Sequence, residues 1–305
     1  MRIVYLGTPD FAVAPLKSLI ENGYNIVGVV TNKDKPVGRK QILTAPPVKQ
    51  LAIENGLKVF QYDKIRIEGV NDLRALKPDI MITCAFGQIL SQEIIDIAPL
   101  GVINIHASLL PKYRGASPIH YAILNGEQKT GITIMKTDAG IDTGDIIYQK
   151  EFDINENETC GELFERLSVL GAQTITRILP KIIANKVDFV KQDDKLATYT
   201  KIIKKEMAKI NWQNTAKDIV NHIRAFCPAP VAFTTFEGNP FKIYSATISM
   251  MEGDCGKVLK ADDELIIGCK DGAVSLKMVQ KAGGKPMDIK DFLRGTKIAV
   301  GEEFK

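Results

Sequence analysis

Two polar side chains that could carry out chemistry follow a short apolar run in the stretch GVINIHASLLPKYRG, residues 101–115. Asn104 and His106 are two positions apart, so on an extended strand both side chains point to the same face. An amide beside an imidazole suits addition to a carbonyl group, because both can donate hydrogen bonds to the developing oxyanion and the imidazole can also move a proton. The alternative is that His106 is a structural histidine, the commoner role of a lone histidine at a strand end.

Such a pair needs a carboxylate that orients the imidazole and favours its protonated form. The segment DAGIDTGD, residues 138–145, supplies three candidates: Asp138, Asp142 and Asp145. Its glycines allow the backbone to approach a ligand closely, although loops rich in Asp and Gly are usually only turns. The spacing does not choose among the three aspartates.

Other kinds of site find little support in the sequence. Ser108 does not lie in a G-x-S-x-G elbow, which favours direct transfer over a covalent intermediate. The first turn, YLGTPDFA, has Gly7 but not the pattern G-x-G-x-x-G, which disfavours a dinucleotide-dependent oxidoreductase. Neither a Walker A loop nor an H-E-x-x-H or C-x-x-C spacing occurs, so we expect no metal site.

Strand-like and helix-like patterns alternate through the first half of the chain, and these elements must position the polar residues. Short β-branched runs lie at 2–6, 26–31, 80–84, 101–105 and 131–135. Helix-like segments between them end on Gly23 and Gly56, and glycine is the residue that best caps a helix C-terminus. Apolar strands alternating with helices predict an α/β fold with a Rossmann-like, doubly wound and mostly parallel sheet. Ligands of such sheets bind beyond the carboxyl ends of the strands, where both polar segments lie.

The second half of the chain has a different character. A long helical pattern over 159–185 is followed by an exposed, basic linker. From residue 215 onward, a helix-like stretch precedes short strand-like runs with Gly, Asp and Asn turns, typical of a small antiparallel β-barrel of the OB type. We therefore predict a catalytic domain at 1–188, a basic linker at 189–208 and a C-terminal OB-like domain at 209–305.

The composition restricts the location and partners of the protein. No apolar stretch approaches the roughly 20 residues that span a membrane, and the N-terminus lacks a secretory signal pattern. Five scattered cysteines fit a reducing cytosol. The net charge is only +4, but 33–49 carries five bases and one acid, and 198–212 carries four lysines and one glutamate. Such clusters either contact phosphates or form solvated faces.

The polar blocks NIHASLLPKYRGASP and DAGIDTGD together resemble the folate-dependent formyltransferases, in which N-x-H-x-S-L-L-P is a hallmark and an aspartate completes a triad. Both blocks stand in the order and spacing of that family. Four further segments resemble the branch of the family that formylates methionyl-tRNA: GTPDFA, KPVGRK, RAFCPAP and QKAGGKPM. The resemblance runs the whole length of the chain.

The resemblance implies transfer of a formyl group from 10-formyltetrahydrofolate to the α-amino group of methionine on initiator tRNA. It implies a triad of Asn104, His106 and Asp142. The folate-contacting segment would be Ser108, Leu109, Leu110 and Pro111, and the residues of the basic loop that reach the tRNA would be Lys35, Arg39 and Lys40. It also implies a bacterial or organellar setting. Because no transit peptide is evident, we expect a bacterial cytoplasm. We also expect the protein to be a monomer.

Two departures from the family pattern are visible. CPAP replaces the usual N-P-W-P after RAF, which removes a tryptophan, and GRKQ replaces a loop of the G-R-G-K type. The second departure leaves the tRNA contacts of the loop open, but it does not affect the chemistry. The rival hypotheses are a formyltransferase or formyl hydrolase that acts on an amino sugar or nucleotide, and a tRNA-binding protein without catalytic activity.

Overall fold

The computed structural model describes residues 1–38 and 40–305, so Arg39 of the predicted basic loop lies outside the described residues. The chain forms two compact units. The first comprises 1–115, 130–153 and 164–200, and the second comprises 116–129, 154–163 and 201–305. The predicted catalytic domain, 1–188, is continuous in sequence. In the structure, two of its segments, 116–129 and 154–163, belong to the second unit. The functional division into domains stays a prediction.

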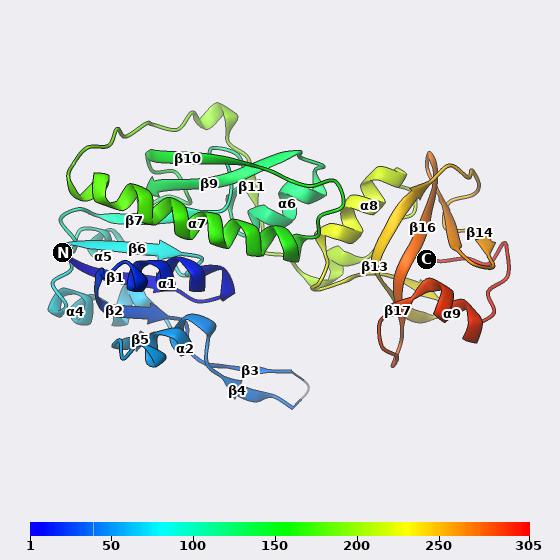
Figure 1. The fold of residues 1–305 in the computed structure, drawn as a ribbon, viewed down its shortest axis with the longest axis horizontal. Coiled ribbons are helices and arrows are strands. Elements are labelled where there is room, and N and C mark those ends of the chain that lie inside the picture. Colours follow the sequence, from blue (N-terminus) through cyan, green and yellow to red (C-terminus); the bar gives the residue numbers. More distant parts are fainter. Residues whose placement is uncertain (39) are drawn as a thin grey trace. The chain divides into compact units, whose positions relative to one another are not determined.

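The first unit is built on a mostly parallel sheet with the strand order β10-β9-β7-β6-β1-β2-β5 (Figure 1). Its strands are β1 (Arg2–Gly7), β2 (Asn25–Thr31), β5 (Val59–Gln61), β6 (Ile80–Cys84), β7 (Val102–His106), β9 (Lys129–Lys136) and β10 (Ile146–Asp153). The pairs among β5, β2, β1, β6 and β7 are parallel, and β9 pairs antiparallel with β7. The predicted fold class is confirmed. The strand β10 escaped prediction because its apolar start, Ile146–Tyr148, is short and the polar residues that follow are mostly exposed.

Helices cover both faces of this sheet (Figure 1). One face carries α1 (Val13–Glu21) and α7 (Cys160–Ile183), which are joined by a 2.7 Å hydrogen bond between Ser18 and Thr176. The other face carries α3 (Ile65–Glu68), α4 (Val70–Ala75) and α5 (Gln92–Ile95), whose apolar residues share a core with β1, β6 and β7. Burial on both sides explains why the strands read as continuous apolar runs.

The predicted glycine caps occur where two helices end. Helix α1 ends at Glu21 and α2 (Pro47–Glu54) ends at Glu54, and each is followed two residues later by a glycine with positive φ. The φ values are 73° at Gly23 and 65° at Gly56. Open space surrounds both positions, so backbone conformation rather than crowding favours glycine there.

A short antiparallel hairpin follows β2 and contains the predicted basic loop. Its strands are β3 (Lys35–Val37) and β4 (Ile42–Thr44). All their residues are exposed, including Val37 at 57%, Ile42 at 61% and Leu43 at 67%. The hairpin therefore adds little to the core of the first unit and presents its side chains to solvent.

The second unit contains the predicted antiparallel strands. They pair in the order β12-β13-β16-β15-β14, and β17 (Met287–Asp288) pairs with β16. Their bounds are Ala232–Phe236, Asn239–Ser249, Gly272–Lys281, Leu265–Cys269 and Val258–Ala261, in that order. The helix α8 (Ala216–Ala225) is capped at its N-terminus by Thr215, whose side chain accepts a hydrogen bond from the Asp218 amide. This unit also contains α6 (Pro118–Leu124) and α9 (Ile289–Gly295).

Most residues of the segment predicted as an exposed linker, 189–208, are exposed, but parts of it pack against the first unit. Gln192 is 6% exposed, and β11 (Tyr199–Thr200) pairs with β8 (Arg114–Gly115) in the first unit. Gln192 is buried because hydrogen bonds with distant backbone groups satisfy its polar side chain. In the described part of the chain, the structure has no helix that could span a membrane.

Candidate active site

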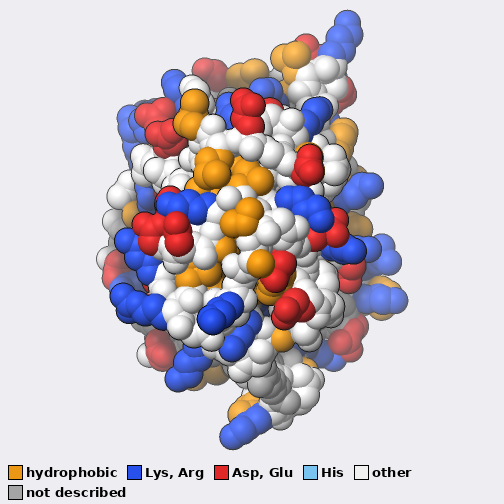
Figure 2. Space-filling view, turned by 90° about the vertical axis from the view of Figure 1, so that its right-hand side faces the viewer, with side chains coloured by type: hydrophobic (Ala, Val, Ile, Leu, Met, Phe, Trp, Pro, Cys, Tyr) orange, Lys and Arg blue, Asp and Glu red, His pale blue; other side chains and the backbone are white. Residues whose placement is uncertain are grey.

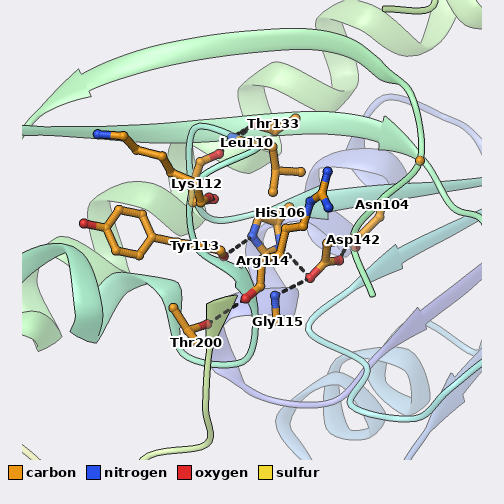
Figure 3. A network of polar contacts seen from close by, with 12 residues as sticks. Asn104, His106, Leu110, Lys112, Tyr113, Arg114, Gly115, Thr133, Asp142 and Thr200 are labelled. Carbon is orange, nitrogen blue, oxygen red and sulfur yellow. Dashed lines mark hydrogen bonds and ion pairs between the residues drawn. The ribbon is translucent and has the colours of Figure 1, made fainter. Parts of the chain in front are cut away.

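The strand β7 presents Asn104 and His106 at its carboxyl end. Asn104 pairs with Thr83 of β6, and His106 pairs with Thr133 of β9, so neighbours on both sides fix the strand. Val102 and Ile105 are buried, and the side chains of Asn104 and His106 turn toward the same group (Figure 3). The predicted shared face follows from strand geometry.

That shared group is the carboxylate of Asp142. Its Oδ1 accepts a hydrogen bond of 3.2 Å from Nδ2 of Asn104, and its Oδ2 lies 3.6 Å from Nδ1 of His106. Oδ2 also accepts a hydrogen bond of 2.8 Å from the backbone N–H of Gly115 (Figure 3). The structure therefore brings together all three residues of the predicted triad.

The other two aspartates of the loop have different positions. The Asp138 carboxylate accepts hydrogen bonds from the Gly140 amide and the Thr143 hydroxyl, at 3.1 and 2.7 Å. The Asp145 carbonyl accepts a hydrogen bond of 2.9 Å from the amide of Lys136. A Cβ atom at Gly144 would collide with the Lys136 carbonyl oxygen, so this turn requires glycine. Asp138 and Asp145 thus shape the loop that carries Asp142.

His106 is 6% exposed and is held from both sides of its ring. Nε2 lies 3.0 Å from the carbonyl oxygen of Tyr113. Because a carbonyl oxygen can only accept, this contact requires a proton on Nε2. Nδ1 can then donate toward Asp142 only when the ring carries both protons.

The amide of Asn104 has a second N–H, which makes no hydrogen bond with any residue that the structure describes. It is a donor for a ligand oxygen. The thiol of Cys84, at the end of the neighbouring β6, is buried, and burial raises its pKa to about 12. Cys84 therefore stays a thiol near neutral pH and is a poor nucleophile, in agreement with direct transfer.

The predicted folate segment, residues 108–111, follows β7 and is tied to β9. The hydroxyl of Ser108 donates to the Lys112 carbonyl at 2.7 Å, and the Thr133 hydroxyl donates to the Ser108 carbonyl at 2.6 Å. Ser108 and Leu110 are buried at 1% and 3% exposure, whereas Leu109 and Pro111 are half-buried. The Ser108 hydroxyl thus shapes the segment, and its predicted folate contacts stay a prediction.

The predicted tRNA residues belong to a separate element. Lys35 begins β3, and Lys40 lies in the turn between β3 and β4. Both are exposed, and Arg39 between them is outside the described residues. The structure places them on the hairpin and not in the cluster around Asp142.

A polar network also lies at the carboxyl ends of β1, β2 and β6. The carbonyl oxygen of Phe86 accepts hydrogen bonds from Thr8 Oγ1 at 3.2 Å and from Asn32 Nδ2 at 3.0 Å. Gln88 Nε2 donates to Asn32 Oδ1 at 2.7 Å. The chain order reverses between β1 and β6, and ligands of open α/β sheets bind at such a switch point. This network, beside the end of β7, escaped prediction because it joins three separate loops.

A second unpredicted feature is the buried Arg114, which is 1% exposed. Its guanidinium donates to Gln192 Oε1 at 3.0 Å, to the Tyr199 hydroxyl at 3.1 Å and to Asp194 at 2.8 Å. Burial lowers the pKa of Arg114, but the hydrogen bonds with Asp194 and Tyr199 outweigh this effect and raise it above its ordinary value. The only feature of the sequence that could have indicated a role for Arg114 is its position inside the turn KYRG.

Models of two protein families match the chain. The formyl transferase model matches residues 1–179, and the model of the formyl transferase C-terminal domain matches residues 202–297. The chain is 44% identical over 306 residues to the methionyl-tRNA formyltransferase of Bacillus subtilis, covering 99% of this chain and 96% of that protein. It is 42% identical over 309 residues to the methionyl-tRNA formyltransferase of Ruminiclostridium cellulolyticum, with 99% of each chain covered.

Solved structures with the same fold include other formyltransferases. An N-formyltransferase from Helicobacter canadensis, in complex with folinic acid and dTDP-3-aminofucose, is 26% identical with a TM-score of 0.71, covering 92% of this chain and 99% of that chain. The methionyl-tRNA formyltransferase from Clostridium thermocellum is similar in fold at 18% identity, with a TM-score of 0.60, covering 93% of this chain and 100% of that chain.

Proposed function

The chain belongs to the methionyl-tRNA formyltransferase family, and from this premise we propose that it formylates the α-amino group of methionyl initiator tRNA. The formyl donor is 10-formyltetrahydrofolate, which serves as a co-substrate. The observation that carries the proposal is the high identity to these enzymes along nearly the whole chain. The contacts of Asn104 and His106 with Asp142 supply a site with suitable chemistry.

The reaction exchanges one carbon–nitrogen bond for another. The neutral amine of the aminoacyl ester attacks the formyl carbon, and the bond from that carbon to N10 of the folate then breaks. Asn104 donates its second N–H to the oxyanion of the tetrahedral intermediate, and the imidazolium of His106, oriented by Asp142 and the Tyr113 carbonyl, stabilises the oxyanion by its positive charge. A proton leaves the attacking nitrogen and reaches N10 by way of His106, Asp142 or a water molecule.

The folate occupies the carboxyl edge of the sheet in this proposal. Leu109 and Pro111, the half-buried residues of the predicted folate segment, follow β7 and are the residues of that segment available to the folate. The loop after β6, held by Thr8 and Asn32, is the other element at this edge. No group of residues suited to a metal ion occurs in the described part of the chain.

The tRNA contacts the exposed basic elements in this proposal. These are the hairpin with Lys35 and Lys40, the lysine-rich segment at 201–209 and the C-terminal unit. Arg39, which lies outside the described residues, stays a predicted tRNA contact. On the face seen in Figure 2, Lys and Arg side chains are spread among acidic ones around a central hydrophobic group. On this face the tRNA would therefore be bound through several separate phosphate contacts and not through one continuous basic patch. We also propose that the enzyme works as a monomer in a bacterial cytoplasm.

The rival acceptors are not favoured by the comparisons. The N-formyltransferase from Helicobacter canadensis, solved in complex with dTDP-3-aminofucose, is 26% identical, against 42% to 45% for the methionyl-tRNA formyltransferases. A tRNA-binding protein without catalytic activity would have no use for two donors and a carboxylate gathered at a strand end.

An acceptor assay tests the proposal. The enzyme is incubated with 10-formyltetrahydrofolate and, in separate reactions, with methionyl initiator tRNA, glycinamide ribonucleotide or a dTDP-linked amino sugar. We expect formyl transfer to methionyl-tRNA that depends on the folate and exceeds transfer to either small acceptor. Preferred transfer to a small acceptor, or tRNA binding without transfer, would contradict the proposal.

A further inference from the structure

Gln192 connects three segments around the triad, although it lies 50 residues from Asp142 in sequence. Its Nε2 donates hydrogen bonds of 2.8 Å to the carbonyl oxygens of both Asp142 and Gly144. Its Oε1 accepts a hydrogen bond of 3.0 Å from Nε of Arg114. Both amide hydrogens and the oxygen are therefore used, and the reverse orientation of the amide would place its oxygen against two carbonyl oxygens.

The residues that follow Gln192 hold the other partners of the triad. The Tyr113 amide donates to Thr198 Oγ1 at 2.8 Å, and the Tyr113 carbonyl is the group that holds His106. Thr200 pairs with Gly115, whose N–H holds Asp142. The segment 192–200 thus supports the backbone groups that contact His106 and Asp142, as well as the loop of Asp142 itself.

The supported groups have backbone conformations that need such support. The φ angle is 53° at Asp142 and 62° at Tyr113, both in the left-handed region. Residues other than glycine persist in this region only where their neighbours hold them. At Gly115, where φ is 95°, a Cβ atom would lie 2.8 Å from the Thr200 carbonyl oxygen, so the pairing of β8 with β11 also requires glycine there.

We propose that Gln192 is a positioning residue for formyl transfer, a role that rests on the proposed function. Its side chain is buried, and its hydrogen bonds are all to protein groups, so its role is to position Asp142. Its two donated hydrogen bonds fix the loop turn so that the Asp142 carboxylate meets Nδ1 of His106 and Nδ2 of Asn104 together. Arg114 keeps the Gln192 amide in the orientation that this requires.

Two substitutions separate this role from simple packing. Gln192→Met keeps the volume but removes the donors and the acceptor, and Gln192→Glu keeps an acceptor for Arg114 while it removes the donors. For both we expect kcat to fall about 10- to 100-fold, as a small misplacement of a catalytic group does, with KM for the folate nearly unchanged. Ser18→Ala, which removes the hydrogen bond between α1 and α7, is the control and should lower thermal stability without changing kcat.

A double-mutant cycle asks whether Gln192 acts through Asp142. If it does, Gln192→Met should lower kcat strongly in the wild type and at most about twofold when Asp142→Ala is already present, because groups that act as a unit are not additive. Full additivity would overturn the proposal. A wild-type enzyme that fails to formylate methionyl-tRNA would instead refute the proposed function.

Nitrogen NMR of the three histidines provides a readout that does not depend on activity. His120 and His222 lie in the second unit and serve as internal controls, and the His106→Asn variant assigns the third signal. We expect Gln192→Met to shift the imidazole resonances of His106 and leave the other two unchanged. An unchanged His106 spectrum would overturn the proposal whatever the acceptor of the enzyme is.

Discussion

At the scale of single residues, the chemistry depends on which carboxylate faces the imidazole. Asp142 accepts hydrogen bonds at both of its oxygens and lies beside Nδ1 of His106. A carboxylate can do this because it has two acceptor oxygens and a negative charge, whereas an amide has a single acceptor oxygen. Replacement of the carboxylate by an amide should therefore disturb both neighbours.

We predict different effects for two aspartates three positions apart. Asp142→Asn should lower kcat by about 10²-fold, because it turns an N–H toward Asn104 or Gly115 and removes the charge beside His106. Asp145→Asn should leave kcat nearly unchanged, since Asp145 contributes a backbone carbonyl. Steady-state kinetics of both variants would check this prediction, and equal losses would contradict it.

The residues around the site show how far the sequence could lead. Strand periodicity was enough to place Asn104 and His106 on one face, because a strand fixes side-chain direction locally. It could not choose among three aspartates, because the choice depends on how the loop with Gly140 and Gly144 turns. The contacts of Gln192 were beyond prediction because they are made by side chains between segments distant in sequence.

At the scale of elements, the strands and helix ends with local signals were predicted and others were not. The apolar runs of β1, β2, β6 and β7 and the caps at Gly23 and Gly56 have local causes. The strands β10 and β11 depend on tertiary pairing, and their sequences have weak patterns. The segment 189–208 read as an exposed linker because its polar residues gave no hint of a buried role.

Two helices of the second unit contain half-buried histidines that make its stability depend on pH. His120 in α6 and His222 in α8 both lie against Phe226, with ring centroids 6.5 and 4.6 Å away. Burial lowers the pKa of each below its ordinary value. Nε2 of His222 has no hydrogen-bond partner among the described residues, so a proton there would bring a poorly compensated charge.

We predict that the free energy of unfolding falls as the pH drops below about 6.5, the ordinary pKa of histidine. Below this pH the histidines of the unfolded chain bind protons that those of the folded chain do not. The free energy of unfolding therefore increases as the pH rises toward about 6.5 and is fully present above that pH. Thermal unfolding at pH 5.5 and pH 7.5 measures the effect, and the double substitution His120→Gln with His222→Gln should reduce it. An effect of the same size in that variant would contradict the assignment.

At the scale of the whole molecule, the proposal requires an aminoacyl-tRNA to be held by groups outside the triad. The exposed hairpin with Lys35 and Lys40 and the lysine-rich segment at 201–209 are the basic elements available. Contacts with phosphates release counterions, so the affinity must decline with salt concentration.

We predict that tRNA affinity falls steeply between low and physiological salt. Lys35→Ala and Lys40→Ala should each reduce the slope of log affinity against log salt by about 1, the loss of one phosphate contact. Lys17→Ala is the matched control, because Lys17 is exposed on α1 and pairs with Glu21 at 3.7 Å. Filter binding at several salt concentrations measures the slopes. Unchanged slopes in both hairpin variants would show that the hairpin does not hold the tRNA.

The proposed catalysis of formyl transfer to methionyl-tRNA by Asn104, His106 and Asp142 can be measured by single-turnover kinetics with excess enzyme and saturating 10-formyltetrahydrofolate. The rate of formyl-methionyl-tRNA formation is measured for the wild type, Asn104→Ala and His106→Ala, with folate binding measured separately. We expect each variant to lose about 10²- to 10³-fold in rate, the usual effect of removing one oxyanion donor, while folate still binds. Rates close to wild type in both variants would contradict the claim.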